Sequence, residues 1–169
     1  MIMKKLYFLI FVLLFPFFAH AQFIGLGGQY SQKADGQFFM NFSYPTFHKK
    51  NPLNSFIASG VEYTTYGGAK LSGLNLKPVQ INTFFSESFF NNTKYTLMLG
   101  VDAGYLFNFP KGHKNGIVIT PNLYFDYKFF FVKGGYDFDV SNGVNQFFIR
   151  AGVCFGMGTI KMFPNTKIW

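Results

Sequence analysis

The sequence predicts an all-β protein, an eight-stranded antiparallel up-and-down transmembrane β-barrel that follows a cleaved signal peptide. Three observations support this fold class. The chain opens with a secretory leader, apolar residues then recur with a period of two, and turn residues interrupt that period after roughly every ten to fifteen positions. Aromatic residues make up 22% of the chain and charged residues only 13%, about half of the usual charged share of about 25%.

The leader has the three parts of a secretory signal peptide. Lysines at positions 4 and 5 precede an apolar run over residues 6–18, and an Ala-His-Ala triplet ends at Ala21. The run is shorter than the roughly 20 residues that a membrane-spanning helix needs, so cleavage after Ala21 is expected to leave no transmembrane helix. The expected parts are a signal peptide over residues 1–21, a barrel over residues 22–163 and a short C-terminal tail over residues 164–169.

The first four strands are separated by turn segments rich in glycine, proline, asparagine and lysine. FIGLGGQYS alternates glycine and polar residues with larger ones and ends at QKADG, and an aromatic-rich strand follows as far as HKKNPLN. The third strand alternates apolar side chains with small or polar ones before YGGAKLSGLN, and ESFFNNTK ends the fourth. These strands are expected over residues 23–31, 37–47, 55–65 and 76–86.

The last four strands show the clearest alternation. The fifth and seventh place large apolar side chains on one face and glycine, threonine, aspartate or lysine on the other. Pro121 lies within the sixth and lacks the N–H that a closed ladder needs, which predicts a bulge there. The eighth carries the chain's only arginine, Arg150, on the face away from its large aliphatic residues. These strands are expected over residues 95–108, 117–126, 130–139 and 146–160.

Two architectures fit an alternating eight-stranded pattern, and they orient the two faces in opposite ways. A soluble lipocalin-like barrel turns aromatic residues inward around an apolar ligand and charges outward to water. A transmembrane barrel turns apolar residues outward to lipid and polar residues inward. The polar face here mixes glycine, serine, threonine and asparagine with a few charges of both signs, which favours the transmembrane arrangement. A soluble periplasmic carrier of an apolar ligand stays the alternative.

Charged residues inside such a narrow barrel must pair, because side chains fill the interior and burial removes their water. We expect Arg150 to be the centre of a structural ion-pair network in the lumen, with carboxylates as its partners. The residues expected in this lumen network are Arg150, Asp102, Glu62, Lys133, Asp137 and Asp126.

Aromatic residues near the strand ends are typical of the two girdles that meet the membrane interfaces. The expected girdle residues are Tyr44, Tyr63, Tyr66, Tyr95, Tyr105, Phe107, Tyr127 and Trp169.

The signal, the short mature chain and the glycine- and aromatic-rich alternating strands together resemble the small outer-membrane β-barrel proteins of the OmpA/OmpX-like group. The cleavage triplet followed by Gln22 resembles exported proteins of the Bacteroidota. This resemblance covers the whole mature chain. It implies insertion into the outer membrane by the barrel-assembly machinery and contact with outer-membrane lipid and lipopolysaccharide. The group's terminal aromatic corresponds to Trp169, or to Phe163 because Pro164 interrupts the strand before the end.

No catalytic centre, cofactor or metal site is predicted. The mature chain has only His48 and His113, both in expected turns at opposite ends of the barrel. His48 beside Ser43 or Tyr44 is more typical of an interface residue than of a catalytic base, and neither histidine has a second metal ligand at a useful spacing. The formal charge of +8 falls by two when the leader's lysines are removed, and the other lysines are dispersed over turns, which argues against a nucleic-acid surface. The expected function is a non-catalytic structural or surface-interaction component of the outer membrane, with its protein partner unassigned; a lipid-modifying outer-membrane enzyme is the weaker alternative.

Overall fold

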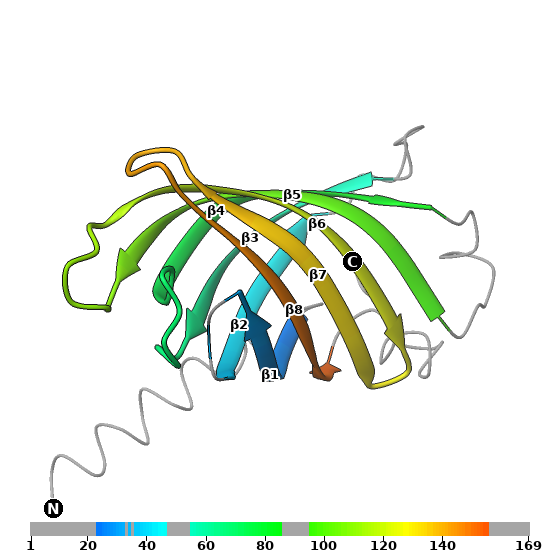
Figure 1. Cartoon of the computed structure of the whole chain (residues 1–169). Helices are drawn as coiled ribbons and strands as arrows, with labels where there is room; N and C mark the ends of the chain where they lie inside the picture. Colours follow the sequence, from blue (N-terminus) through cyan, green and yellow to red (C-terminus); the bar gives the residue numbers. More distant parts are fainter. Residues whose placement is uncertain (1–22, 33, 35, 47–54, 86–94, 156–169) are drawn as a thin grey trace, which may run out of the picture.

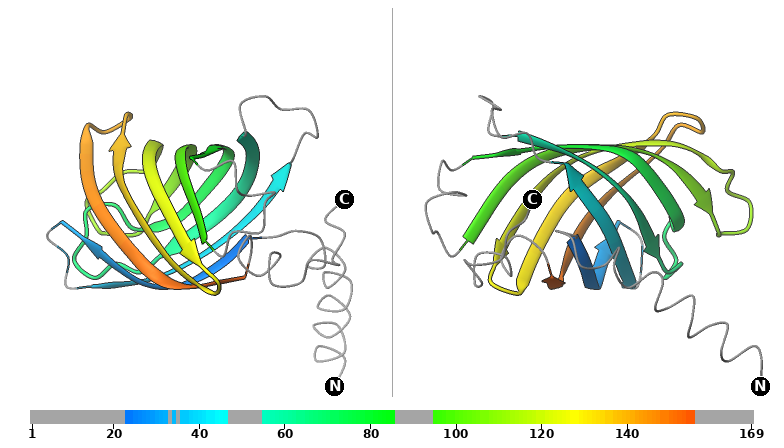
Figure 2. Two further views of the ribbon diagram at one scale, coloured as in Figure 1. Left: turned by 90° about the vertical axis from the view of Figure 1, so that its right-hand side faces the viewer. Right: turned by 180° about the vertical axis from the view of Figure 1, so that it is seen from behind.

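In a computed structural model, the chain forms a closed barrel of eight antiparallel strands (Figure 1). Each strand pairs with the next along the chain, and β1 pairs with β8 to close the barrel, so the predicted eight-stranded up-and-down fold is confirmed. The strands wrap obliquely around the barrel axis (Figure 2). The structure describes residues 23–32, 34, 36–46, 55–85 and 95–155. The strands are β1 (Phe23–Ser31), β2 (Gln37–Thr46), β3 (Ser55–Thr64), β4 (Gly73–Phe84), β5 (Tyr95–Asn108), β6 (Gly116–Tyr127), β7 (Phe130–Asp139) and β8 (Val144–Phe155).

The strand boundaries follow the apolar period closely, and the predicted bounds of β1, β5 and β7 agree with the structure. Strand β4 begins at Gly73, earlier than expected, because Gly73 pairs with both Thr64 of β3 and Asn108 of β5. Several expectations lie outside the described residues: the signal peptide, the continuation of β8 to residue 160 and the C-terminal tail.

The outer surface is apolar and the lumen is polar. On β8, Ile149 and Val153 are exposed on the outside, whereas Phe148 and Arg150 are buried inside. The other strands alternate in the same sense, so exposed large apolar side chains come from every strand of the barrel. Among the described residues, 18 polar or charged residues are buried against 13 hydrophobic ones, which inverts the usual core of a soluble domain.

The barrel has two rims. The first rim holds the strand ends at Phe23, Tyr127 and Phe155, and the second rim holds the β3–β4 and β5–β6 loops. Exposed aromatic residues lie near both, as expected from the sequence. Those near the first rim include Tyr44, Tyr95 and Tyr127, those near the second include Tyr66, Tyr105 and Phe107, and half-buried Tyr63 contacts Phe109 there. Trp169 lies outside the described residues.

A bulge interrupts β4 rather than β6. The register of β4 shifts against β5 between Leu76 and Val79 and against β3 between Lys77 and Gln80. The carbonyl of Pro78, within both intervals, accepts a hydrogen bond from Ser59 Oγ at 2.7 Å. A bulge is where a strand can hold a proline, because an extra residue there needs no ladder N–H. The predicted bulge at Pro121 is wrong: the β6–β7 ladder skips that position and resumes in the same register.

The β3–β4 loop covers the second rim. Residues 67 and 68 are glycines with φ values of 46° and 83°, which lets the chain turn back over the lumen and bury Ala69 and Leu71. Gln146 of β8 holds the loop from another part of the rim. Its Oε1 accepts hydrogen bonds from the backbone N–H groups of Lys70 at 3.0 Å and Leu71 at 3.1 Å, and its Nε2 donates to the Leu71 carbonyl at 3.1 Å. This end of the lumen is therefore plugged by the chain itself.

Candidate functional site

Arg150 binds a carboxylate from the other side of the lumen. Its Nη2 donates to Glu62 Oε1 at 2.7 Å, its Nη1 donates to Glu62 Oε2, and its Nε donates to Gln29 Oε1. The two parallel bonds to Glu62 form the fork that a guanidinium makes with a carboxylate. Because Arg150 and Glu62 are both buried, this pair links β8 to β3 through the barrel interior.

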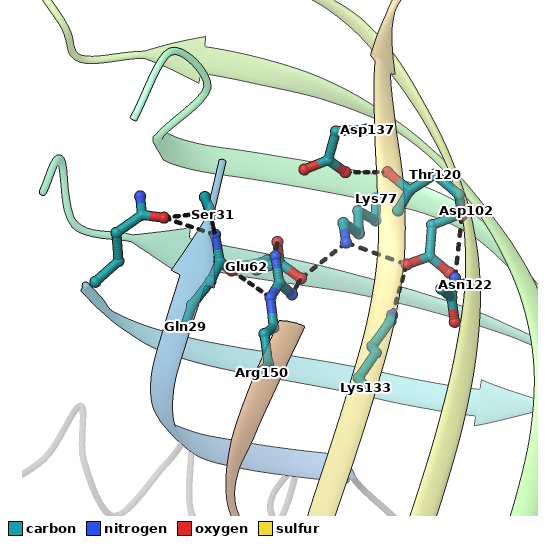
Figure 3. Close-up of polar contacts among 11 residues, drawn as sticks. Gln29, Ser31, Glu62, Lys77, Asp102, Thr120, Asn122, Lys133, Asp137 and Arg150 are labelled. Carbon is teal, nitrogen blue, oxygen red and sulfur yellow. Dashed lines mark hydrogen bonds and ion pairs between the residues drawn. The ribbon is translucent and has the colours of Figure 1, made fainter. Parts of the chain in front are cut away.

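Lys77 continues the chain of charges. Its Nζ lies 2.8 Å from Glu62 Oε2 and 3.1 Å from Asp102 Oδ2, and Lys133 Nζ lies 2.9 Å from the same oxygen of Asp102. The five residues therefore form one line of alternating charge across the lumen, which we call the ion-pair layer (Figure 3). The ion-pair layer comprises Arg150 of β8, Glu62 of β3, Lys77 of β4, Asp102 of β5 and Lys133 of β7.

Aromatic rings hold the guanidinium in place. The Cζ atom of Arg150 lies 4.2 Å from the ring centroid of Phe148 and 5.2 Å from that of Phe39. A side chain at Gly135 would begin 2.6 Å from Phe148, so glycine at this position leaves the room that the Phe148 ring occupies. Gly135 on β7 thus makes room for Phe148 on β8, and the Phe148 ring packs against the buried cation of Arg150.

Two of the acidic residues expected in the network lie outside the ion-pair layer. Asp137 accepts a hydrogen bond from Thr120 Oγ1 at 2.6 Å. Asp126 is fully buried opposite Thr96 in the β5–β6 ladder, close to the first rim. Neither carboxylate is a direct partner of Arg150 in the described structure, and Asp102 is not one either. Arg150 therefore ends the line of charges instead of forming its centre.

Lys77 is the residue that the sequence pattern missed, although it occupies the centre of the layer. The bulge at Pro78 explains why the pattern missed Lys77, because the inward positions of β4 switch there from odd to even residue numbers. Asn75 and Lys77 point inward before the bulge, and Gln80 points inward after it. The sequence of β4 nevertheless contained a signal for this bulge. The outward residues keep a period of two on each side of the Lys-Pro pair, and the extra residue between them indicates a bulge that re-aims the side chain beside it.

Two cavities flank the ion-pair layer. The first cavity has a volume of about 70 Å³ and lies between the layer and the first rim, where residues such as Phe56, Met98 and Phe131 line it. The second cavity has a volume of about 20 Å³ and lies toward the second rim, lined by Asp137, Leu71 and other residues. Glu62 and Arg150 line both cavities, so the ion-pair layer lies between them.

The remaining reactive side chains are dispersed. His113 lies in the β5–β6 loop, and His48 lies outside the described residues. Cys154 is buried in the lumen, where its Sγ lies 3.3 Å from the Tyr124 hydroxyl. Among the residues that the structure describes, no group of three or more His, Cys, Asp or Glu side chains could hold a metal ion, and in the same part of the chain no helix is long and apolar enough to cross a membrane.

Comparisons with known proteins found no relative of this chain. No family model matches the chain, and neither a curated protein nor a solved structure matches it.

Proposed function

We propose that this protein is an integral outer-membrane β-barrel that crosses the membrane with its strands and has a plugged, non-conducting lumen. The observation that carries the proposal is the inversion of the two faces. Apolar side chains cover the outside on every strand, whereas the lumen buries an ion-pair layer. Soluble monomers rarely expose a continuous apolar patch larger than a few hundred Å² to water, and an apolar surface around the whole barrel exceeds that.

Strand length agrees with this proposal. A transmembrane strand needs about 9 to 11 residues when it is tilted, and the strands here have between 9 and 14 residues. The middle of the outer surface carries aliphatic residues such as Val101 and Leu123, and exposed tyrosines lie nearer the rims. That order of aliphatic band and aromatic girdles is the one found on outer-membrane barrels.

The lipocalin-like alternative requires the opposite arrangement of faces. A soluble carrier would surround an apolar ligand with its inward aromatic residues and present charges to water. Here the charges of Arg150, Lys77 and Glu62 are buried, and residues such as Leu99 and Ile117 are exposed. The geometry therefore favours the membrane barrel over the carrier.

The resemblance to the OmpA/OmpX-like group gives the finer form of the proposal. The leader directs export, the barrel-assembly machinery inserts the chain, and outer-membrane lipid surrounds it. With the first rim in the periplasm, Lys70, Lys111 and Lys114 lie in loops on the cell surface, where they can contact lipopolysaccharide phosphates as point charges. The loops are short, so we propose a structural or limited surface-interaction role without catalysis. An acyl-transfer assay with His113→Ala as comparison tests the non-catalytic part.

Fractionation and folding assays test the membrane placement. The full chain should sediment with outer membranes, resist a carbonate wash, need detergent for solubility and migrate on gels with a heat-dependent shift. Release into the wash as a detergent-free soluble protein would contradict the proposal.

An outward-facing substitution gives a sharper test of lipid contact. Val101→Arg, in the middle of β5, should destabilise a lipid-embedded barrel by about 2 to 4 kcal/mol, because arginine at the bilayer midplane has that cost. Phe109→Arg is the matched control, since this exposed residue lies in a loop at the second rim. Equal, small effects of both substitutions on unfolding in lipid would indicate that Val101 faces water.

A further inference from the structure

The walls of the first cavity combine apolar side chains with polar and charged ones on the side of the ion-pair layer, and its size suits a small molecule. A single water needs about 10 to 15 Å³, so the volume of about 70 Å³ leaves room for roughly five to seven heavy atoms. The largest apolar side chains on its walls are Phe23, Phe39, Phe56, Met98, Tyr124 and Phe131. Walls of this kind favour an aliphatic body over a fully polar ligand.

Lys133 lines this cavity on the side of the ion-pair layer and has unused hydrogen-bond donors. An ammonium has three N–H donors, and the described contacts of Lys133 use one of them, to Asp102 at 2.9 Å. Lys77 contacts the same oxygen of Asp102, so one carboxylate oxygen is shared by two ammonium groups. Asp137 lines the second cavity, and Asp126 does not line the first, so neither carboxylate lies beside Lys133 in the first cavity. A carboxylate ligand would give Lys133 a second anionic partner and two further acceptors.

Asn122 gives the same cavity an unmet acceptor. Its side chain is 4% exposed, and its Nδ2 donates to the Thr120 carbonyl at 3.0 Å. Its Oδ1 is buried and has no hydrogen-bond partner within the described part of the chain. A side chain at Gly100 would begin 2.8 Å from this oxygen, so the glycine leaves space around the amide. A buried acceptor without a donor is costly, and a ligand hydroxyl would satisfy it.

The two groups lie close enough to act on one molecule. In the β6–β7 ladder Asn122 is opposite Gly135 and Tyr124 is opposite Lys133, so Asn122 and Lys133 are diagonal neighbours on the lumen face. Figure 3 shows both side chains beside Asp102. We propose that the first cavity binds a short aliphatic hydroxycarboxylate, with its carboxylate on Lys133, its hydroxyl donating to Asn122 Oδ1 and its carbon chain between the phenyl rings.

Titration calorimetry of the refolded full chain tests the ligand class with three probes of nearly equal size. 3-Hydroxybutyrate should bind most tightly. Butyrate should bind about threefold to tenfold more weakly, because it lacks the hydroxyl hydrogen bond, and butyramide at least tenfold more weakly, because it lacks the charge. Octanoate should bind no better than butyrate, since its chain exceeds the cavity. Equal binding of butyrate and butyramide, or no binding of any probe, would overturn the proposal.

Variants locate the site, and a heat-dependent gel shift checks that each one folds. Lys133→Gln should lose at least tenfold in affinity for butyrate, and Asn122→Ala should remove the preference for 3-hydroxybutyrate. Lys77→Met is the matched control, because Lys77 also contacts Asp102 but does not line the cavity. Ala58→Leu fills the cavity without changing a charge and should abolish binding. Binding that survives in folded Ala58→Leu, or that falls equally in Lys77→Met and Lys133→Gln, would refute this site.

Discussion

Arg150→Ala is the most informative change to the barrel, because it removes two buried hydrogen bonds to Glu62 and one to Gln29. Deleting one partner of a buried pair typically costs about 3 to 5 kcal/mol. Glu62 still has Lys77 Nζ at 2.8 Å in the variant, which limits the loss of stability. The substitution also removes the contact between the guanidinium and the Phe148 ring, which is worth about 2 kcal/mol when desolvated. We therefore expect a total loss of about 3 to 5 kcal/mol.

A double-mutant cycle identifies the partner. Arg150 and Glu62 should show a coupling energy of about 2 to 3 kcal/mol, whereas Arg150 and Asp102, which are joined only through Lys77 and Glu62, should couple by less than about 1 kcal/mol. Asp102→Asn is therefore not expected to rescue Arg150→Ala, although the sequence alone made that rescue plausible.

The assay is urea unfolding of the refolded barrel in lipid, followed by the heat-dependent gel shift. Val153→Ala, on the outer face of the same strand, is the control and should cost less than about 1 kcal/mol. An Arg150→Ala barrel as stable as the parent, or a larger coupling to Asp102 than to Glu62, would refute the geometry of the ion-pair layer.

Three further predictions concern the bulge, the topology and the lumen. Deleting Pro78 should abolish the heat-dependent gel shift, because the lost residue turns Lys77 or the rest of β4 to the wrong face; Pro78→Ala keeps the residue count and should fold. In intact cells of a Cys154→Ser background, Lys114→Cys should react with an impermeant thiol reagent and Lys128→Cys should not, since the two loops lie at opposite rims; the reverse pattern would invert the proposed orientation. Planar bilayers with the purified protein should show no steady porin-scale current, because the ion-pair layer crosses the lumen, and regular large openings would contradict a plugged barrel.

Much of the fold follows from local pattern. A period of two, broken by turn residues, predicts antiparallel strands and their approximate ends, because successive side chains of a strand point to opposite faces. For that reason the faces of β3, β5, β7 and β8 could be assigned from the residues alone, and the structure agrees with them. The same pattern misplaced the bulge. Proline lacks an N–H at both Pro78 and Pro121, and only the pairing with neighbouring strands decides which site gains an extra residue.

The sequence by itself determined that Arg150, Glu62, Asp102 and Lys133 share the polar face of their strands, since alternation needs only the chain's own order. The folded structure decided that this face points into the lumen. Which charges touch was decided by the tertiary structure. Contact across a lumen depends on strand register and barrel closure, so residues 88 positions apart, Arg150 and Glu62, become partners. The bulge placed Lys77 between Glu62 and Asp102. The stagger of the strands along the barrel axis left Asp137 and Asp126 outside the ion-pair layer. Register is a property of paired strands, and no single strand's sequence contains it.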